Sequence, residues 1–186
     1  AAAGGKLRMM VKIHATGSWR REALRARIVP SSRHIVPAVE SLIQSAWADG
    51  QRRLGTKPFD GPMCRMEGWR ANKTALEIDV SLSSYRIFLG TNLNDAVSPR
   101  LSRDVCANPV GVSSALLTQD GWLMFGRRNG SVAYYPNRVH PFAGALEEQD
   151  LADVFGAVER ELHEELSLSR HEIESIRCLG IAEDLR

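Results

Sequence analysis

The stretch from Arg160 to Leu168 reads RELHEELSL, and it decides both the fold and the chemistry that the sequence predicts. Apolar side chains recur with helical spacing before and through it, so we expect a helix from Asp153 to Leu166. A helix turns by about 100° per residue, which places Glu161, Glu164 and Glu165 on one ridge. Neighbouring carboxylates repel one another unless a cation lies among them, and oxygen ligands of this kind suit Mg²⁺ or Mn²⁺.

A solvated charged face is the usual explanation for a Glu-rich helix. Two observations disfavour it here. No Lys or Arg follows these glutamates at four-residue spacing along the ridge. In addition, the fixed pattern Arg-Glu-x-x-Glu-Glu would rarely arise by chance in a chain of this size. Phe155, Val158, Leu162 and Leu166 occupy a neighbouring arc, so the helix can bury one side while the ridge faces a cleft. The pattern therefore favours a metal-binding helix.

The helix and the residues before it resemble the Nudix box, in which a Gly and an acid precede Arg-Glu and then a pair of glutamates. Gly144 matches the opening Gly, Arg160 with Glu161 matches the central pair, and the paired acids follow. Asp150 stands where the first Glu belongs, nine residues rather than seven separate it from Arg160, and Ser167 replaces the closing Gly. The acid is kept and the insertion falls in a loop, where added length costs little.

This resemblance implies a set of site residues. Glu161 and Glu165 are expected to be metal ligands, followed by Glu164 and the backbone carbonyl of Gly144. The implied cofactor is Mg²⁺ or Mn²⁺. The implied chemistry is attack of water on a diphosphate, with the metal neutralising the developing charge. One glutamate, with Glu161 and Glu164 as the catalytic candidates, would take the proton from the water.

Three arginines are further candidates. Arg160 is a third catalytic candidate beside Glu161 and Glu164. It is expected to hold the carboxylate of either Asp150 or Glu161 in position. An ordinary surface arginine is the alternative. Arg127 and Arg128 follow an expected strand, from which guanidinium groups could meet substrate phosphates. Ordinary surface charge explains them equally well.

Further segments resemble a Nudix subgroup that has an extra N-terminal domain and whose animal member is a UDP-glucose pyrophosphatase. These segments are Phe59–Pro62, Ser84–Asn92, Asn108–Val112 and Phe125–Arg128. The similarity runs from about Val36 to the last residue. It implies hydrolysis of a UDP-sugar to UMP and sugar 1-phosphate.

Within the second of those segments, Tyr85, Arg86, Thr91 and Asn92 are candidates for binding the uracil or the ribose. Packing in the core is the alternative, and we favour it for the aromatic residues because such side chains are mostly structural.

The expected fold is α+β, a Nudix-type α/β/α sandwich with a mixed sheet. We place a domain boundary near residue 107: residues 1–106 form a small α+β substrate-binding extension, and residues 107–186 form the Nudix domain. The elements expected are strands at Leu7–Ile13, Met63–Trp69, Thr74–Leu82, Val110–Thr118, Trp122–Arg127 and Ile176–Ala182, and helices at Trp19–Ala26, Val36–Leu54 and after Ser84, besides Asp153–Leu166.

Composition restricts the partners. The 186 residues carry a net charge of +2, too small to indicate binding to nucleic acid or to a membrane surface. No apolar run approaches the roughly 20 residues that cross a bilayer. Three widely spaced cysteines favour a reducing compartment such as the cytoplasm. The Arg-rich first forty residues also fit an organellar transit peptide, which is the alternative.

A Nudix domain normally continues beyond the strand that ends near Ala182. We therefore expect a sheet that is incomplete at its C-terminal side and is completed by further polypeptide or by a second chain in an assembly. Two other functions stay open: hydrolysis of another nucleotide diphosphate, such as an ADP-sugar or a dinucleotide, and binding without turnover.

Overall fold

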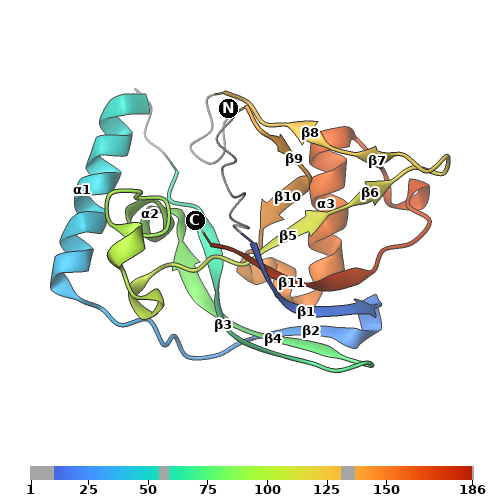
Figure 1. The fold of residues 1–186 in the computed structure, drawn as a ribbon, viewed down its shortest axis with the longest axis horizontal. Coiled ribbons are helices and arrows are strands. Elements are labelled where there is room, and N and C mark those ends of the chain that lie inside the picture. Colours follow the sequence, from blue (N-terminus) through green and yellow to red (C-terminus); the bar gives the residue numbers. More distant parts are fainter. Residues whose placement is uncertain (1–10, 55–58, 131–136, 186) are drawn as a thin grey trace, which may run out of the picture.

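The computed structural model describes residues 11–54, 59–130 and 137–185. Its architecture is α+β with a mixed sheet, as the sequence predicts. Figure 1 shows α1 and α2 on one side of the strands and α3 on the other. In chain order the elements are β1 (Val11–Trp19), β2 (Leu24–Ile28), α1 (Pro37–Leu54), β3 (Pro62–Ala71), β4 (Leu76–Ser84), α2 (Tyr85–Gly90), β5 (Gly111–Ser114), β6 (Leu116–Leu117), β7 (Leu123–Met124), β8 (Gly126–Arg127), β9 (Val139–His140), β10 (Phe142–Ala145), α3 (Val154–Leu166) and β11 (Cys178–Asp184).

A three-stranded sheet in the order β2-β4-β3 forms the base of the molecule. The strands predicted at Met63–Trp69 and Thr74–Leu82 are confirmed as β3 and β4, which form an antiparallel hairpin. The Asn72 side chain accepts bonds from the backbone N–H groups of Thr74 and Ala75 in the turn, both at 2.8 Å. Leu76 and Val80 are fully buried because alternate residues of a strand face the same side. β2 runs parallel to β4, so the sheet is mixed.

The predicted helix at Trp19–Ala26 is wrong. Residues 21–23 form a single 3-10 turn, and the chain then enters β2. Leu24 and Ala26 pack against the core, whereas Arg25 and Arg27 are exposed. This alternation has the period of a strand, and pairing with β4 outweighs the helix propensity of the arginines and alanine.

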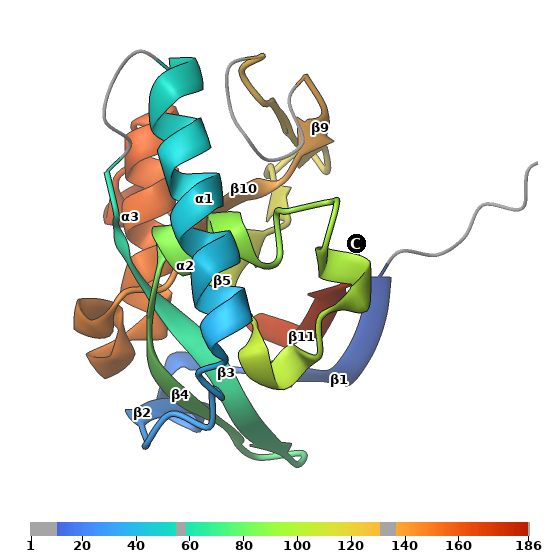
Figure 2. The ribbon, with the colours of Figure 1, turned by 90° about the vertical axis from the view of Figure 1, so that its left-hand side faces the viewer.

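The first and last strands of the described chain pair with each other. β1 and β11 are antiparallel, with Val11 opposite Asp184 and Trp19 opposite Cys178, and both views show them side by side (Figures 1 and 2). The strand predicted at Leu7–Ile13 is confirmed from Val11 onward as part of β1. Residues 7–10 lie outside the described residues. The strand predicted at the C-terminal end is confirmed as β11.

The segment from 110 to 127 is less regular than predicted. β5 pairs with β10, β6 pairs with β7, and β8 pairs with β9. The two long strands predicted here are thus interrupted. Between them the chain turns at Gly121, which has a φ of 89° and whose N–H donates to the Thr118 carbonyl at 2.9 Å. A left-handed φ of this kind favours glycine.

One apolar core crosses residue 107. Trp19, Cys64 and Leu76 pack in the same cluster as Leu146 and Ala157. A smaller cluster under α1 joins Val39 and Ile43 to Val105 and Cys106. The proposed division into an extension and a Nudix domain therefore does not coincide with a gap in packing.

The helix predicted at Val36–Leu54 is confirmed as α1, and the short helix after Ser84 is α2. The Trp47, Tyr85 and Phe88 rings meet edge-on between them, with centroids 6.5 Å and 6.4 Å apart. Within the described residues, no helix combines the length and apolarity needed to cross a membrane. The cysteines at 64, 106 and 178 are free thiols.

Candidate active site

The helix that carries the acidic ridge is α3. It buries Phe155, Ala157 and Leu162, and the helix packs against β10 and β5. Glu161 is half-buried, and Glu164 and Glu165 are exposed. The predicted division of the helix into an apolar side and an acidic side is therefore present.

Glu161 reaches the neighbouring strand at Gly144. A β-carbon built on Gly144 would coincide with the Glu161 carboxylate. Gly144 lies in β10, opposite Val112 of β5. Only a residue without a side chain leaves room for this approach, so the opening Gly of the motif and the central Glu are in direct contact.

A triangle of backbone bonds fixes the end of β10. The Leu146 N–H donates to the Val110 carbonyl at 2.9 Å, and the Val110 N–H donates to the Cys64 carbonyl at 2.8 Å. The Cys64 N–H donates to the Leu146 carbonyl at 2.8 Å, which closes the triangle. Cys64 and Leu146 are fully buried. Gly144 is thus attached to a rigid part of the core.

Arg160 bridges two carboxylates. It donates to Asp150 at 3.1 Å and to Glu161 at 2.9 Å, which are the two partners that the sequence offered as alternatives. Asp150 is only 8% exposed and also accepts a bond from the Glu147 N–H at 2.9 Å. The Asp that replaces the first Glu of the Nudix box therefore anchors Arg160, and Arg160 in turn orients Glu161.

The ridge is partly neutralised. Arg160 also lies 3.7 Å from Glu164, a contact that arises because the arginine precedes that glutamate by four residues. Burial raises the pKa of Glu161, Arg160 opposes this rise, and Glu164 and Glu165 add to it. One guanidinium group shared among three carboxylates, with Glu165 beside them, leaves the ridge with an excess of negative charge.

The helix ends at a residue in the left-handed conformation. Ser167 has a φ of 59°, and its N–H donates to the His163 carbonyl at 2.8 Å. A left-handed C-terminal position is most easily occupied by glycine. The Ser that replaces the closing Gly of the Nudix box therefore keeps the backbone geometry of that position at some energetic cost.

The donor set fits a divalent cation. Glu161 is fixed between Gly144 and Arg160, while the exposed Glu164 and Glu165 can change rotamer without disturbing the core. Among the described residues, no three His, Cys, Asp or Glu side chains already surround a common point. Hard oxygen donors with an excess of negative charge suit Mg²⁺ or Mn²⁺, and drawing the two exposed glutamates inward would complete the set.

The other predicted site residues lie on elements other than α3. Arg127 in β8 is exposed and donates to the Asn137 carbonyl at 3.3 Å. Arg128 follows it, and its backbone N–H donates to the Arg138 carbonyl at 3.0 Å. The assignment of both residues to substrate phosphates remains a prediction.

The candidates in and after α2 make contacts within the fold. Tyr85 packs between α1 and α2, and the Arg86 N–H donates to Asp60 at 2.8 Å. Thr91 is fully buried and accepts a bond from the Ala107 N–H at 3.2 Å. The Asn92 side chain accepts a bond from the Asn108 N–H at 3.1 Å. Figure 1 places α2 and α3 on different sides of the strands, and a role in reading the uracil or ribose remains a prediction.

Sequence reasoning missed the turn that precedes α3. Residues 148–152 form a 3-10 turn closed by a capping box in which Glu147 and Asp150 exchange bonds. An acid three residues after a capping side chain is the signal that could have revealed it. This turn accommodates the two extra residues that precede the helix, and it buries Asp150 beside Arg160.

The α+β fold, the glycine-to-glutamate contact and the acidic helix together match what the resemblance to the Nudix box implies. No protein-family model matches the chain. It is similar to the human protein called uridine diphosphate glucose pyrophosphatase NUDT22, with 30% identity over 89% of this chain. The mouse protein of the same name is 28% identical over 89% of the chain, and the cattle protein is 29% identical over 81%.

These relatives confirm the resemblance to the Nudix subgroup. The chain spans 65% of the length of the human relative, 64% of the mouse relative and 57% of the cattle relative. The similarity covers both the segment before residue 107 and the segment after it, since a match over 89% of the chain cannot lie on one side alone.

Proposed function

We propose that this chain is the catalytic part of a metal-dependent Nudix hydrolase that cleaves a nucleoside diphosphate sugar. The substrate class is a UDP-sugar resembling UDP-glucose, and the products are UMP and sugar 1-phosphate. The names of the human, mouse and cattle relatives support this substrate.

The proposal rests on one arrangement. Glu161 is seated against Gly144 and is hydrogen-bonded to Arg160, which is itself anchored on the buried Asp150. On a purely solvated helix face, the carboxylates would be exposed and would not be fixed by contacts of this kind. A carboxylate oriented beside two exposed glutamates is what a cation-dependent hydrolase requires.

Each residue has a role in this chemistry. Glu161, Glu164, Glu165 and the Gly144 carbonyl would hold a divalent cation. Such a cation would neutralise the diphosphate charge and make the attacking water more acidic. The water oxygen bonds to one phosphorus while the bond from that phosphorus to the bridging oxygen breaks. Glu161 or Glu164 accepts the proton that the water loses.

Arg160 has a positioning role. Its bonds to Asp150 and Glu161 keep the Glu161 carboxylate in one orientation before substrate arrives. An oriented ligand reduces the reorganisation required when the cation and substrate bind.

The test is a product assay with the purified chain. The protein is incubated with Mg²⁺ and with UDP-sugars, ADP-sugars and dinucleotides, and the products are separated by chromatography. Release of UMP from UDP-sugars alone supports the proposal. Hydrolysis of the other nucleotides would assign a different substrate, and absence of any product with either Mg²⁺ or Mn²⁺ would favour a binding subunit.

A further inference from the structure

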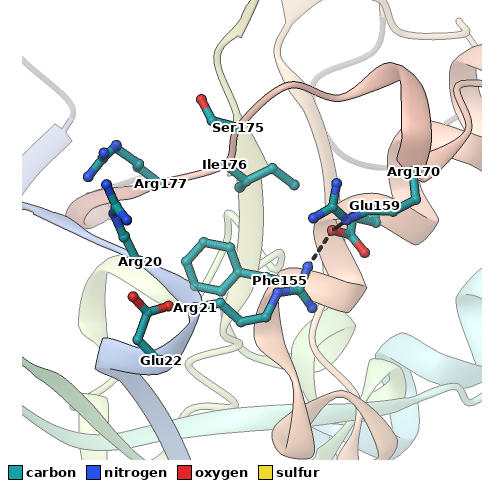
Figure 3. A pocket seen from close by; sticks show the side chains of 9 residues that line it. All are labelled: Arg20, Arg21, Glu22, Phe155, Glu159, Arg170, Ser175, Ile176 and Arg177. Carbon is teal, nitrogen blue, oxygen red and sulfur yellow. Dashed lines mark hydrogen bonds and ion pairs between the residues drawn. The ribbon is translucent and has the colours of Figure 1, made fainter.

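A pocket lies on a different side of α3 from the carboxylate ridge. Its volume is about 300 Å³, and we call it the arginine pocket. Helical geometry separates Phe155 and Glu159, which line it, from Glu161 and Glu165 on the ridge. Figure 3 shows the lining side chains, which come from the turn after β1, from α3 and from the segment between α3 and β11: Arg20, Arg21, Glu22, Phe155, Glu159, Arg170, Ser175, Ile176 and Arg177.

Two of the four arginines are already paired. Arg170 lies 2.6 Å from Glu159, and Arg21 contacts the same carboxylate and also Asp153. Glu159 therefore fixes one wall of the pocket, with both guanidinium groups directed toward it (Figure 3).

The other two arginines, on the opposite wall, have no ion-pair partner among the described residues. Arg177 donates to the Ser18 hydroxyl at 3.4 Å, and no ion pair to it is recorded within the described part of the chain. The Arg20 side chain has no recorded hydrogen bond or ion pair there either. In Figure 3 the Phe155 ring lies between these two arginines and Glu159 with its ion-pair partners. Glu22 also lines the pocket, but it makes no recorded bond to either arginine among the described residues.

The shape of the pocket limits what can occupy it. Its volume is at the lower end of the range for ligand sites, which begins at about 300 Å³. Phe155 is only 4% exposed because the Arg21 guanidinium covers its ring at 5.6 Å, so no aromatic face is free to stack on a base. These features suit a compact anion and not a whole nucleotide sugar.

We propose that the arginine pocket binds a phosphate group, either as inorganic phosphate or as a small phosphate monoester, through Arg20 and Arg177. Guanidinium groups match the oxygens of phosphate in geometry and in charge. Two unpaired arginines facing one small cavity repel each other, and a bound dianion relieves this repulsion. The site is separate from the hydrolytic ridge and requires no metal.

The test is calorimetric titration of the purified chain with inorganic phosphate and with glucose 1-phosphate, in EDTA and at low salt. Binding of either ligand supports the proposal. Equal affinities identify the phosphate group itself as the ligand, and tighter binding of the ester identifies a monoester. Absence of binding by both ligands overturns the proposal.

Variants locate the site. The double variant Arg20→Gln with Arg177→Gln should weaken binding by about tenfold or more, since it removes two charge-assisted contacts. Arg100→Gln removes one positive charge outside the pocket and should leave the affinity within about twofold. Glu22→Gln should tighten binding because it removes a negative charge from the lining. Equal affinities of the double variant and Arg100→Gln would overturn the proposal.

Two controls separate this site from the ridge and from misfolding. Glu161→Gln should bind phosphate as the wild type does, and a loss of binding in that variant would place the anion at the ridge and refute the proposal. Both arginines of the double variant are exposed, so its thermal midpoint should match that of the wild type.

Discussion

The carboxylate of Glu161 occupies the space that a side chain at residue 144 would need. This relationship joins α3 to β10, since Gly144 is paired with Val112 in the strand ladder. Gly144 does not have a positive φ, so the glycine is required for close approach and not for an unusual backbone conformation. The position of the glutamate therefore depends on a residue 17 positions earlier in the chain.

Gly144→Ala should impair hydrolysis more than folding. The added methyl group displaces the Glu161 carboxylate, and a misplacement of this size at a reacting centre costs roughly a hundredfold in rate. Steady-state kinetics across a range of Mg²⁺ concentrations measures the effect. Gly68→Ala is the matched control, because a β-carbon there meets nothing within 4 Å. Equal activities of the two variants would contradict the assigned position of Glu161.

Arg160→Lys should lower both stability and activity. Lysine keeps the charge, but a single ammonium group cannot hold Asp150 and Glu161 together as the planar guanidinium does. Loss of one bond to the buried Asp150 should cost about 1–2 kcal/mol in the free energy of unfolding. Urea denaturation measures it. Arg27→Lys changes an exposed pair with Asp79 and should shift stability by less than about 0.5 kcal/mol.

Glu165→Gln should weaken the response to metal while preserving the fold. Glu165 is exposed, so the amide replaces the carboxylate without disturbing packing, but it removes a charged ligand. The Mg²⁺ concentration for half-maximal activity should rise by about tenfold or more. Glu174→Gln, also exposed, removes the same charge away from the ridge and should behave as wild type. A Glu165→Gln variant with unchanged metal dependence would refute the ligand assignment.

The sequence predicts those elements whose periodicity is decided by burial. Leu76, Ile78 and Val80 alternate with polar residues and form β4, and the spacing of Val39 and Ile43 is that of α1. The prediction was wrong at 19–26, where a short segment obtains its structure from a distant partner, β4. Pairing between β1 and β11, separated by most of the chain, leaves no local signal either.

The candidate site could be predicted only in part, because local spacing is readable from the sequence and contacts between distant elements are not. The ridge follows from helical spacing alone, so the proximity of Glu161, Glu164 and Glu165 was predictable. The contact of Glu161 with Gly144 required a matching motif, because it joins two different elements. The two arginines of the arginine pocket that have no ion-pair partner among the described residues, Arg20 and Arg177, come from opposite ends of the sequence, and no spacing rule connects them.

The buried pair of Arg65 and Glu67 should make the protein sensitive to acid. The two charges lie 2.6 Å apart, with side chains 4% and 7% exposed. Burial alone would raise the pKa of Glu67, but hydrogen bonds from Ser32, Ser81 and Arg65 outweigh it and lower the pKa to about 2. Because the folded pKa lies below the ordinary value, the stabilisation is complete above about pH 5 and is lost as the pH falls toward 2.

The size of this effect follows from the shift. A pKa lowered from 4.5 to about 2 corresponds to about 3 kcal/mol of stability at neutral pH. Denaturation between pH 7 and pH 3 measures it. Glu67→Gln should remove that part of the pH dependence and destabilise the protein at pH 7, since it leaves Arg65 buried without its counter-charge. Glu77→Gln breaks an exposed pair with Arg70 and should change stability by less than about 1 kcal/mol.

Ser167→Gly should stabilise the protein. Ser167 ends α3 with a φ of 59° and a ψ of 21°, and an L-residue in this left-handed conformation pays a steric cost of about 1 kcal/mol that glycine does not. The greater freedom of glycine in the unfolded chain reduces the gain, so we expect a net stabilisation of about 0.5 kcal/mol. Ser113→Gly, at an exposed position of β5, should instead destabilise by a similar amount because its backbone is extended. Urea denaturation of both variants decides the sign, and destabilisation by Ser167→Gly would mean that the Ser167 side chain makes a contact that outweighs its strain.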